Sequence, residues 1–252
     1  MDQRIWSDQE VIKLSRKFVC ARLSTYEDHA EGELLKKLFR GRSGELENTV
    51  FVILAPDGKT RLSKSGRSPQ MVFGGKSGWE STILALEMHS ISNQYPAKKN
   101  PAGLPPLPVS KDLRRSLNVA ACDRQLLVVA DRVSEKTMKD LQRLAWIDPF
   151  IGRIGWGIAQ QPNEVAAIGL TAGKAAVYIC KPGEFGLKGT LLTKLPPTAT
   201  VAQLESALLQ ALKTTREPLK NYRRHVSKGR RLNKSWESEI KVTDPLIPPR
   251  QN

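Results

Sequence analysis

The chain has 252 residues, of which 40% are hydrophobic and 26% charged, a composition typical of globular proteins rather than disordered ones. Its 40 Lys and Arg against 25 Asp and Glu give a formal charge of +15, which favours polyanionic partners. The three cysteines, Cys20, Cys122 and Cys180, are far apart and form no C-x-x-C pair, so their spacing excludes zinc ribbons and dithiol redox motifs.

The first part of the chain has the pattern of a small α/β domain. Capping residues, helical apolar spacing and β-branched runs provide the signals. In chain order they predict a helix over 7–17, a strand over 18–24 (FVCARLS), a helix over 24–38, strands over 49–55 and 59–66 joined by a PDG turn, and a helix over 79–91.

Residues 95–111 contain five prolines and little periodicity, which predicts an extended linker between two domains. The second half repeats the order of strand and helix signals found in the first half. It predicts a strand over 125–131, a helix capped by Ser134, strands over 153–160, 174–181 and 189–195, and a last amphipathic helix from Val201 to Leu212. The predicted organisation is therefore a domain over 1–94, a linker over 95–116, a domain over 117–215 and a flexible tail over 216–252.

The C-terminal tail concentrates the positive charge. From Lys213 to Asn252 there are eleven Lys and Arg and four Asp and Glu, a net charge of +7 within the chain's total of +15. Cations bind phosphates, and interleaved aromatic residues such as Tyr222 and Trp236 stack on bases. Two interpretations remain open, a solvated basic end and a polyanion site formed by Arg223, Arg224, Arg230 and Arg231.

Strand, helix and strand followed by a hairpin predict a mixed sheet with helices on both faces. This arrangement resembles the thioredoxin fold, twice over, across roughly 5–91 and 124–213. The segments IWSDQEVIKLSRKFVCARL and NTVFVILAPDGKTRLSKSG are similar to the family's second-strand region and hairpin. The strand end VC-x-R-L-x-TYE and the loop GRSGELENT are similar to bacterial thioredoxin-like proteins.

The chain departs from the family at the residues that carry the family's chemistry. The thioredoxin family works through C-x-x-C at a helix start and a cis-proline before the hairpin. This sequence has no C-x-x-C, has Asn48-Thr49 where Pro-Thr is expected, and has no proline directly before AAVYI. The resemblance therefore implies a tandem, degenerate thioredoxin-like protein without dithiol exchange, acting in interaction or scaffolding with a protein partner.

A thiol-based alternative centres on Cys20. On the predicted strand Cys20 and Arg22 share a face, and a nearby cation lowers a thiol's pKa. Free cysteine is among the most buried residue types, so the burial tendency favours Cys20 as a small hydrophobe in the core. Thus a redox enzyme or sensor with Cys20 and Arg22 stands beside a structural role.

Other candidate sites are weaker. Arg42 and Arg67 lie in two Gly-Arg-Ser loops that flank the predicted hairpin and are candidates for holding an anion. The three histidines are scattered, so the sequence predicts no metal site and no cofactor. Without an apolar leader or a long apolar stretch we expect no membrane span, and a cytoplasmic location for the chain as given or export for a processed form.

Overall fold

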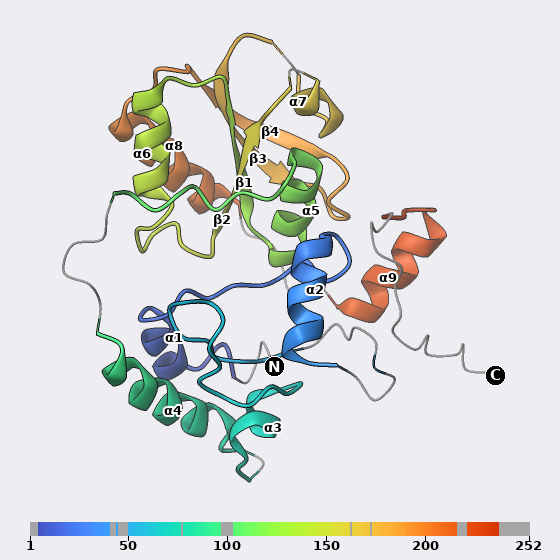
Figure 1. The fold of residues 1–252 in the computed structure, drawn as a ribbon. Coiled ribbons are helices and arrows are strands. Elements are labelled where there is room, and N and C mark those ends of the chain that lie inside the picture. Colours follow the sequence, from blue (N-terminus) through green and yellow to red (C-terminus); the bar gives the residue numbers. More distant parts are fainter. Residues whose placement is uncertain are drawn as a thin grey trace. The chain divides into compact units, whose positions relative to one another are not determined.

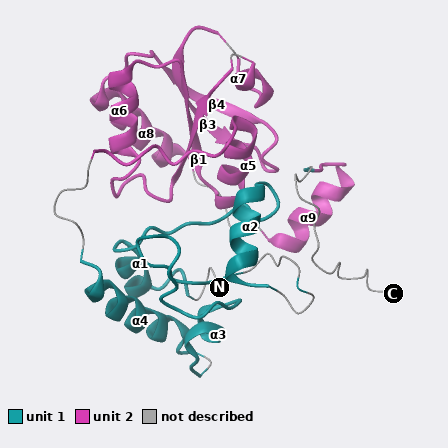
Figure 2. Ribbon diagram, viewed as in Figure 1, with its two compact units in different colours: residues 1–99, 236–252 teal, residues 100–235 magenta. Residues whose placement is uncertain are grey.

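The computed structural model describes residues 5–40, 44, 50–76, 78–96, 103–161, 163–171, 173–215 and 221–236. The chain divides into two compact units (Figure 2). Unit 1 comprises residues 1–99 and 236–252, and unit 2 comprises residues 100–235.

The regular elements described in unit 1 are short helices joined by loops. Its helices are α1 (Gln9–Ser15), α2 (His29–Leu38), α3 (Pro69–Phe73) and α4 (Glu80–Gln94). Helices α1 and α2 begin after Asp8 and Asp28, whose carboxylates accept hydrogen bonds from backbone N–H groups of the first turn. Side chains of α1 and α4, with Val11 and Leu84 at the centre, form its small apolar core.

The predicted sheet of the first half is not present among the described residues. Residues 18–24 form no strand, and Val19 is 90% exposed. The expected hairpin is reduced to two isolated bridges, Phe51 with Gly66 and Leu54 with Arg61. A two-stranded hairpin is marginal without a third strand, and the apolar run at 18–24 finds no partner strand to pair with.

Unit 2 contains a four-stranded mixed sheet (Figure 1). Its strands are β1 (Leu126–Asp131), β2 (Ile154–Ala159), β3 (Ala176–Pro182) and β4 (Gly189–Leu195), in the order β2-β1-β3-β4. The central strand β1 is parallel to β2 and antiparallel to β3, and β3 is antiparallel to β4.

Helices cover both faces of this sheet. They are α5 (Leu113–Asp123), α6 (Glu135–Leu144), α7 (Glu164–Ala167) and α8 (Val201–Thr214). One apolar cluster joins the sheet to α6 and α8, and the other joins it to α5 and α7 (Figure 1). Every residue of β1 is buried, as expected for a strand covered on both sides.

The elements expected in the second half are confirmed. Ser134 caps α6 by accepting a hydrogen bond from the backbone N–H of Thr137, and the four strands and α8 occur within one or two residues of the predicted bounds. Helix α5 was not predicted. It follows residues 103–112, expected as part of a linker, in which Leu107 is buried and Val109 bridges Trp156.

The described part of the basic C-terminal segment contains helix α9 (Tyr222–Arg231), which belongs to unit 2. No helix in the described ranges is long and apolar enough to cross a membrane.

Candidate functional site

Cys20 does not have the environment that either interpretation of it requires. It is exposed, so it is not part of a core. Partial desolvation nevertheless raises the pKa of its thiol, and a hydrogen bond to the Ser15 carbonyl oxygen, at 3.7 Å, offsets this only in part. Arg22 does not contribute to the shift. A raised pKa reduces the thiolate fraction, which is the reactive form.

The other two cysteines belong to unit 2. Cys180 is buried on β3, and burial raises the pKa of its thiol to about 12. Cys122 is exposed on α5. Within the described ranges no group of three or more His, Cys, Asp or Glu side chains is placed to hold a metal ion.

The described residues do not test the predicted anion site of Arg42 and Arg67. Arg67 is exposed next to the bridge residue Gly66. Arg42 lies outside the described residues.

Helix α9 is anchored to the β3–β4 loop (residues 183–188). The ring of His225 stacks on Phe185, with ring centroids 4.8 Å apart. Gly229 is buried beside the same phenylalanine: a Cβ at this glycine would lie 3.2 Å from the ring. Because His225 and Gly229 are four residues apart, one side of α9 faces the loop.

A carboxylate completes the anchor. Glu184 accepts a hydrogen bond from Lys228 Nζ at 2.5 Å, and its other oxygen lies 3.8 Å from His225 Nδ1. Both side chains of the Lys228 pair are more than 40% exposed, so this ion pair orients α9 more than it stabilises it. Asn221 caps the helix by accepting from the backbone N–H of Arg224.

The opposite side of α9 is cationic, and we call it the basic face. It comprises the four arginines predicted from the sequence: Arg223, Arg224, Arg230 and Arg231. Spacings of one, seven and eight residues from Arg223 place them on one side of a helix. With Ser227 and Lys228, three of them line an open surface hollow.

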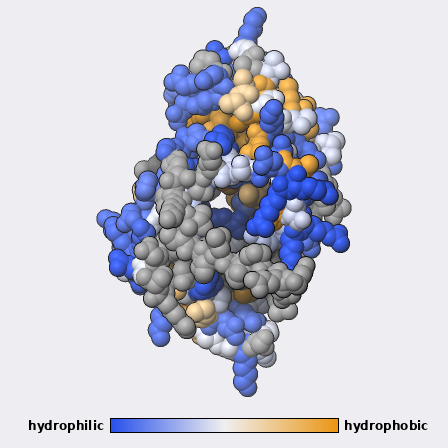
Figure 3. Space-filling model, turned by 90° about the vertical axis from the view of Figure 1, so that its right-hand side faces the viewer, coloured by the Kyte–Doolittle hydropathy of each residue, from blue (hydrophilic) through white to orange (hydrophobic). Residues whose placement is uncertain are grey.

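The basic face is available to a partner. All four arginines are exposed, and none forms an ion pair with another described residue. Figure 3, which looks at the side where α9 lies in Figure 1, shows strongly hydrophilic side chains there. Tyr222, at the start of the helix, is 80% exposed. Trp236, the other aromatic residue of the basic segment, belongs to unit 1.

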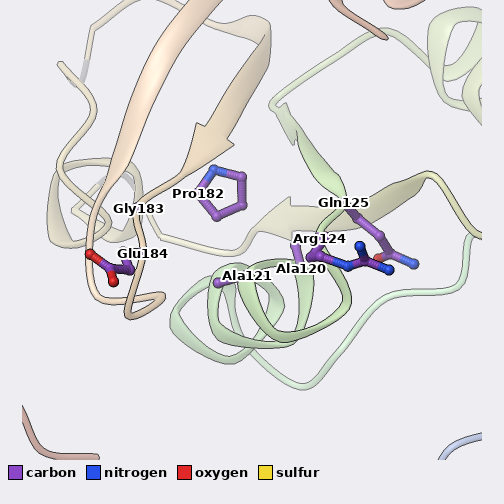
Figure 4. A pocket seen from close by; sticks show the side chains of 7 residues that line it. All are labelled: Ala120, Ala121, Arg124, Gln125, Pro182, Gly183 and Glu184. Carbon is purple, nitrogen blue, oxygen red and sulfur yellow. The ribbon is translucent and has the colours of Figure 1, made fainter. Parts of the chain in front are cut away.

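A small cavity near α5 is not a second candidate site. Figure 4 shows Arg124 and Gln125 at one side and the turn Pro182–Glu184 at the other. Its volume is about 10 Å³, which is room for about one water molecule. It is too small for an organic ligand.

Sequence reasoning found the arginines but not their anchor. Glu184 and Phe185 lie between the strands predicted over 174–181 and 189–195, and the sequence pattern assigns them no role. The available signal was a phenylalanine in a loop of glycines and charged residues, where an aromatic side chain usually needs a partner.

Comparison with protein-family models, with curated proteins and with solved structures found no match to this chain.

Proposed function

We propose that this protein is a non-catalytic, thioredoxin-like binding protein whose unit 2 presents the basic face of α9 to single-stranded nucleic acid. The observation that carries the proposal is the anchored helix: four exposed arginines on one side, and Glu184 with Phe185 holding the other. Fixing the helix before binding reduces the ordering cost that a free basic segment pays on binding.

The arrangement of unit 2 supports the thioredoxin-like part of the proposal. Strand β1, helix α6 and parallel strand β2 are followed by α7, the antiparallel pair β3 and β4, and α8. This is the mixed sheet with helices on both faces on which the resemblance was based.

The start of α6 supports the non-catalytic part. The N-cap and first turn of α6 read Ser134-Glu135-Lys136-Thr137, so hydroxyls occupy the first and fourth of these positions, the spacing of C-x-x-C. Their oxygens are 2.8 Å apart. Hydroxyls cannot undergo thiol–disulfide exchange, which requires a thiolate and a disulfide sulfur.

Nucleic acid is favoured over an anionic membrane by what covers the other side of α9. A membrane-surface helix buries an apolar face in the lipid boundary. In α9 the side opposite the arginines is occupied by Phe185 and Glu184. Tyr222, next to Arg223 in the sequence and 80% exposed at the start of the helix, instead supplies the stacking ring that single strands bind in addition to cations.

The test is fluorescence anisotropy of a labelled 20-nucleotide single strand with the full chain. The variant replaces Arg223, Arg224, Arg230 and Arg231 by Gln, which keeps helix propensity. The matched control replaces four exposed lysines elsewhere by Gln: Lys59, Lys64, Lys76 and Lys136. We expect the arginine variant to lose binding and the lysine variant to retain most of it.

Two further measurements separate the alternatives. Tyr222→Ala should weaken single-strand binding by about 5-fold or more, the effect of removing one stacking platform, and should leave duplex binding unchanged. Equal losses in the arginine and lysine variants, or tighter binding to phosphatidylserine vesicles than to the oligonucleotide, would contradict the proposal.

A further inference from the structure

The carboxyl end of β1 is a place where an open α/β sheet can hold a ligand. From β1 the chain passes to β2 on one side of it and later to β3 on the other. Ligands of such sheets bind outside the carboxyl ends of strands at this change of direction. Here Asp131 ends β1 and Arg132 follows it.

Asp131 and Arg132 form a fixed pair at this point. The Asp131 side chain is 3% exposed, and it accepts hydrogen bonds from Arg132 Nε at 2.8 Å and from Nη2 at 3.1 Å. Nη2 also donates to the Gly173 carbonyl oxygen at 2.8 Å. Arg132 has φ of 50°, the left-handed region that is costly for a residue other than glycine.

Two side chains from β3 and β4 lie at the same edge. Tyr178 is directly opposite Lys194 in the strand register, and the Lys194 ammonium is 5.1 Å from the centre of its ring. The Lys194 ammonium also lies 3.6 Å from where a Cβ of Gly173 would be. Arg132 and Lys194 therefore meet beside Gly173, and Lys194 lies over the ring of Tyr178.

The Tyr178 hydroxyl is the anomaly that points to a ligand. Its oxygen is buried and has no hydrogen-bond partner among the described residues. A buried hydroxyl without a partner is unfavourable, and each one in a native protein calls for an explanation. In the same described set, Arg132 Nη1 and Lys194 Nζ make no hydrogen bond. Three donors thus remain unused: those of the two cations beside Gly173, and the hydroxyl of the tyrosine whose ring Lys194 covers.

We propose that this edge of unit 2, here called the β1-end site, binds a small oxyanion, the phosphate or carboxylate group of a low-molecular-weight ligand. Arg132 and Lys194 outweigh Asp131 by one positive charge. Arg132 Nη1, Lys194 Nζ and Tyr178 Oη supply the donors. Because Lys194 is exposed and its ammonium lies over the Tyr178 ring, movement of this side chain would admit the anion to the hydroxyl while Arg132 stays on Asp131.

The β1-end site is independent of the nucleic-acid proposal. Helix α9 docks on the loop that joins Pro182 to Gly189, at the opposite end of β3 and β4 from Lys194. Variants of one site therefore leave the other intact.

The test measures thermal unfolding of the full chain in increasing inorganic phosphate or sodium acetate, at constant ionic strength set with chloride. The variants are Tyr178→Phe and Lys194→Gln, with Lys136→Gln as the surface-charge control. Phosphate or acetate should raise the Tm of the unmodified chain in a saturable way. Each site variant should need at least about ten-fold more anion for the same rise, as expected when one bond to a charged group is lost.

Tyr178→Phe has a second expected effect of opposite sign. Without anion its Tm should equal or exceed that of the unmodified chain, because the unpaired hydroxyl is gone. If this core variant does not fold, the Lys194→Gln variant, at an exposed position, still tests whether the anion binds at the β1-end site. A response to only one of the two anions assigns the ligand's chemical group.

The inference would be overturned if neither anion raised the Tm. It would equally be overturned if Tyr178→Phe or Lys194→Gln responded like Lys136→Gln, or if the response disappeared in the four-arginine variant of α9. That last result would place the anion on α9 instead.

Discussion

The docking of α9 can be tested by removing its anchor. Helices of fewer than about 12 residues are marginal alone in water, and α9 has ten. Its stability should therefore depend on Phe185 and Glu184. An aromatic pair contributes about 0.5–1.5 kcal/mol and an exposed ion pair about 0.2–1 kcal/mol. Their sum, roughly 0.7–2.5 kcal/mol, corresponds to about a 3- to 60-fold change in the opening equilibrium.

Hydrogen exchange read by mass spectrometry on peptides covering α9 measures that equilibrium. In the double variant Glu184→Gln/Phe185→Ala these amides should exchange faster by the factor above, while peptides of β1 and β3 keep their protection. The control is Glu135→Gln, which removes an exposed ion pair of 2.6 Å with Lys139 on α6. Unchanged exchange of α9 in the double variant would refute the docking argument, as would equal acceleration in the control.

Further predictions concern the core of unit 2 and the cysteines Cys20 and Cys180. Gly186→Ala should lower stability by more than about 1 kcal/mol, because φ is +66° and a Cβ would lie 2.8 Å from the Asn118 Cα; an unchanged urea midpoint would argue against it. Leu127→Ala, at a fully buried position of β1, should cost about 2–5 kcal/mol, and a loss below 1 kcal/mol would mean that β1 is not central. Iodoacetamide should modify Cys20 in the native protein with a rate that still rises above pH 9, whereas rapid modification of native Cys180 would be inconsistent with its burial. Because the pKa of Cys180 rises from 9.0 to about 12 on folding, its neutral form stabilises the native state fully below pH 9, and that contribution should decline between pH 9 and 12 in urea titrations and be reduced in Cys180→Ala.

The second half of the fold was readable from sequence because its local signals agree with its tertiary structure. The run that became β1 is continuously apolar, and Ser134 caps α6 in the way its sequence position suggests. The first half misled the same reasoning. Residues 18–24 have the apolar character of a strand, but a strand needs a partner, and none is present in the described part of unit 1.

The candidate site was readable only in part for a related reason. The composition and spacing of the arginines predict the basic face from the sequence. The sequence does not predict the anchor of the helix, because Lys228 and Glu184 are 44 residues apart in the chain and their pairing depends on where the β3–β4 loop lies. Tyr178 lies within the predicted strand over 174–181, and nothing in the sequence singles it out, since its unpaired hydroxyl is visible only once its neighbours are placed.

The central claim is tested most directly by the salt dependence of single-strand binding. Each phosphate contact contributes a slope of about −0.7 in log K against log salt concentration, so four arginines predict about −2.8, or about a 50-fold loss between 50 and 200 mM salt. The account predicts this slope for the unmodified chain and the four-lysine control, and a slope near zero for the variant with Arg223, Arg224, Arg230 and Arg231 replaced by Gln. The same slope in all three proteins would show that the overall charge of +15, and not the basic face of α9, binds the nucleic acid.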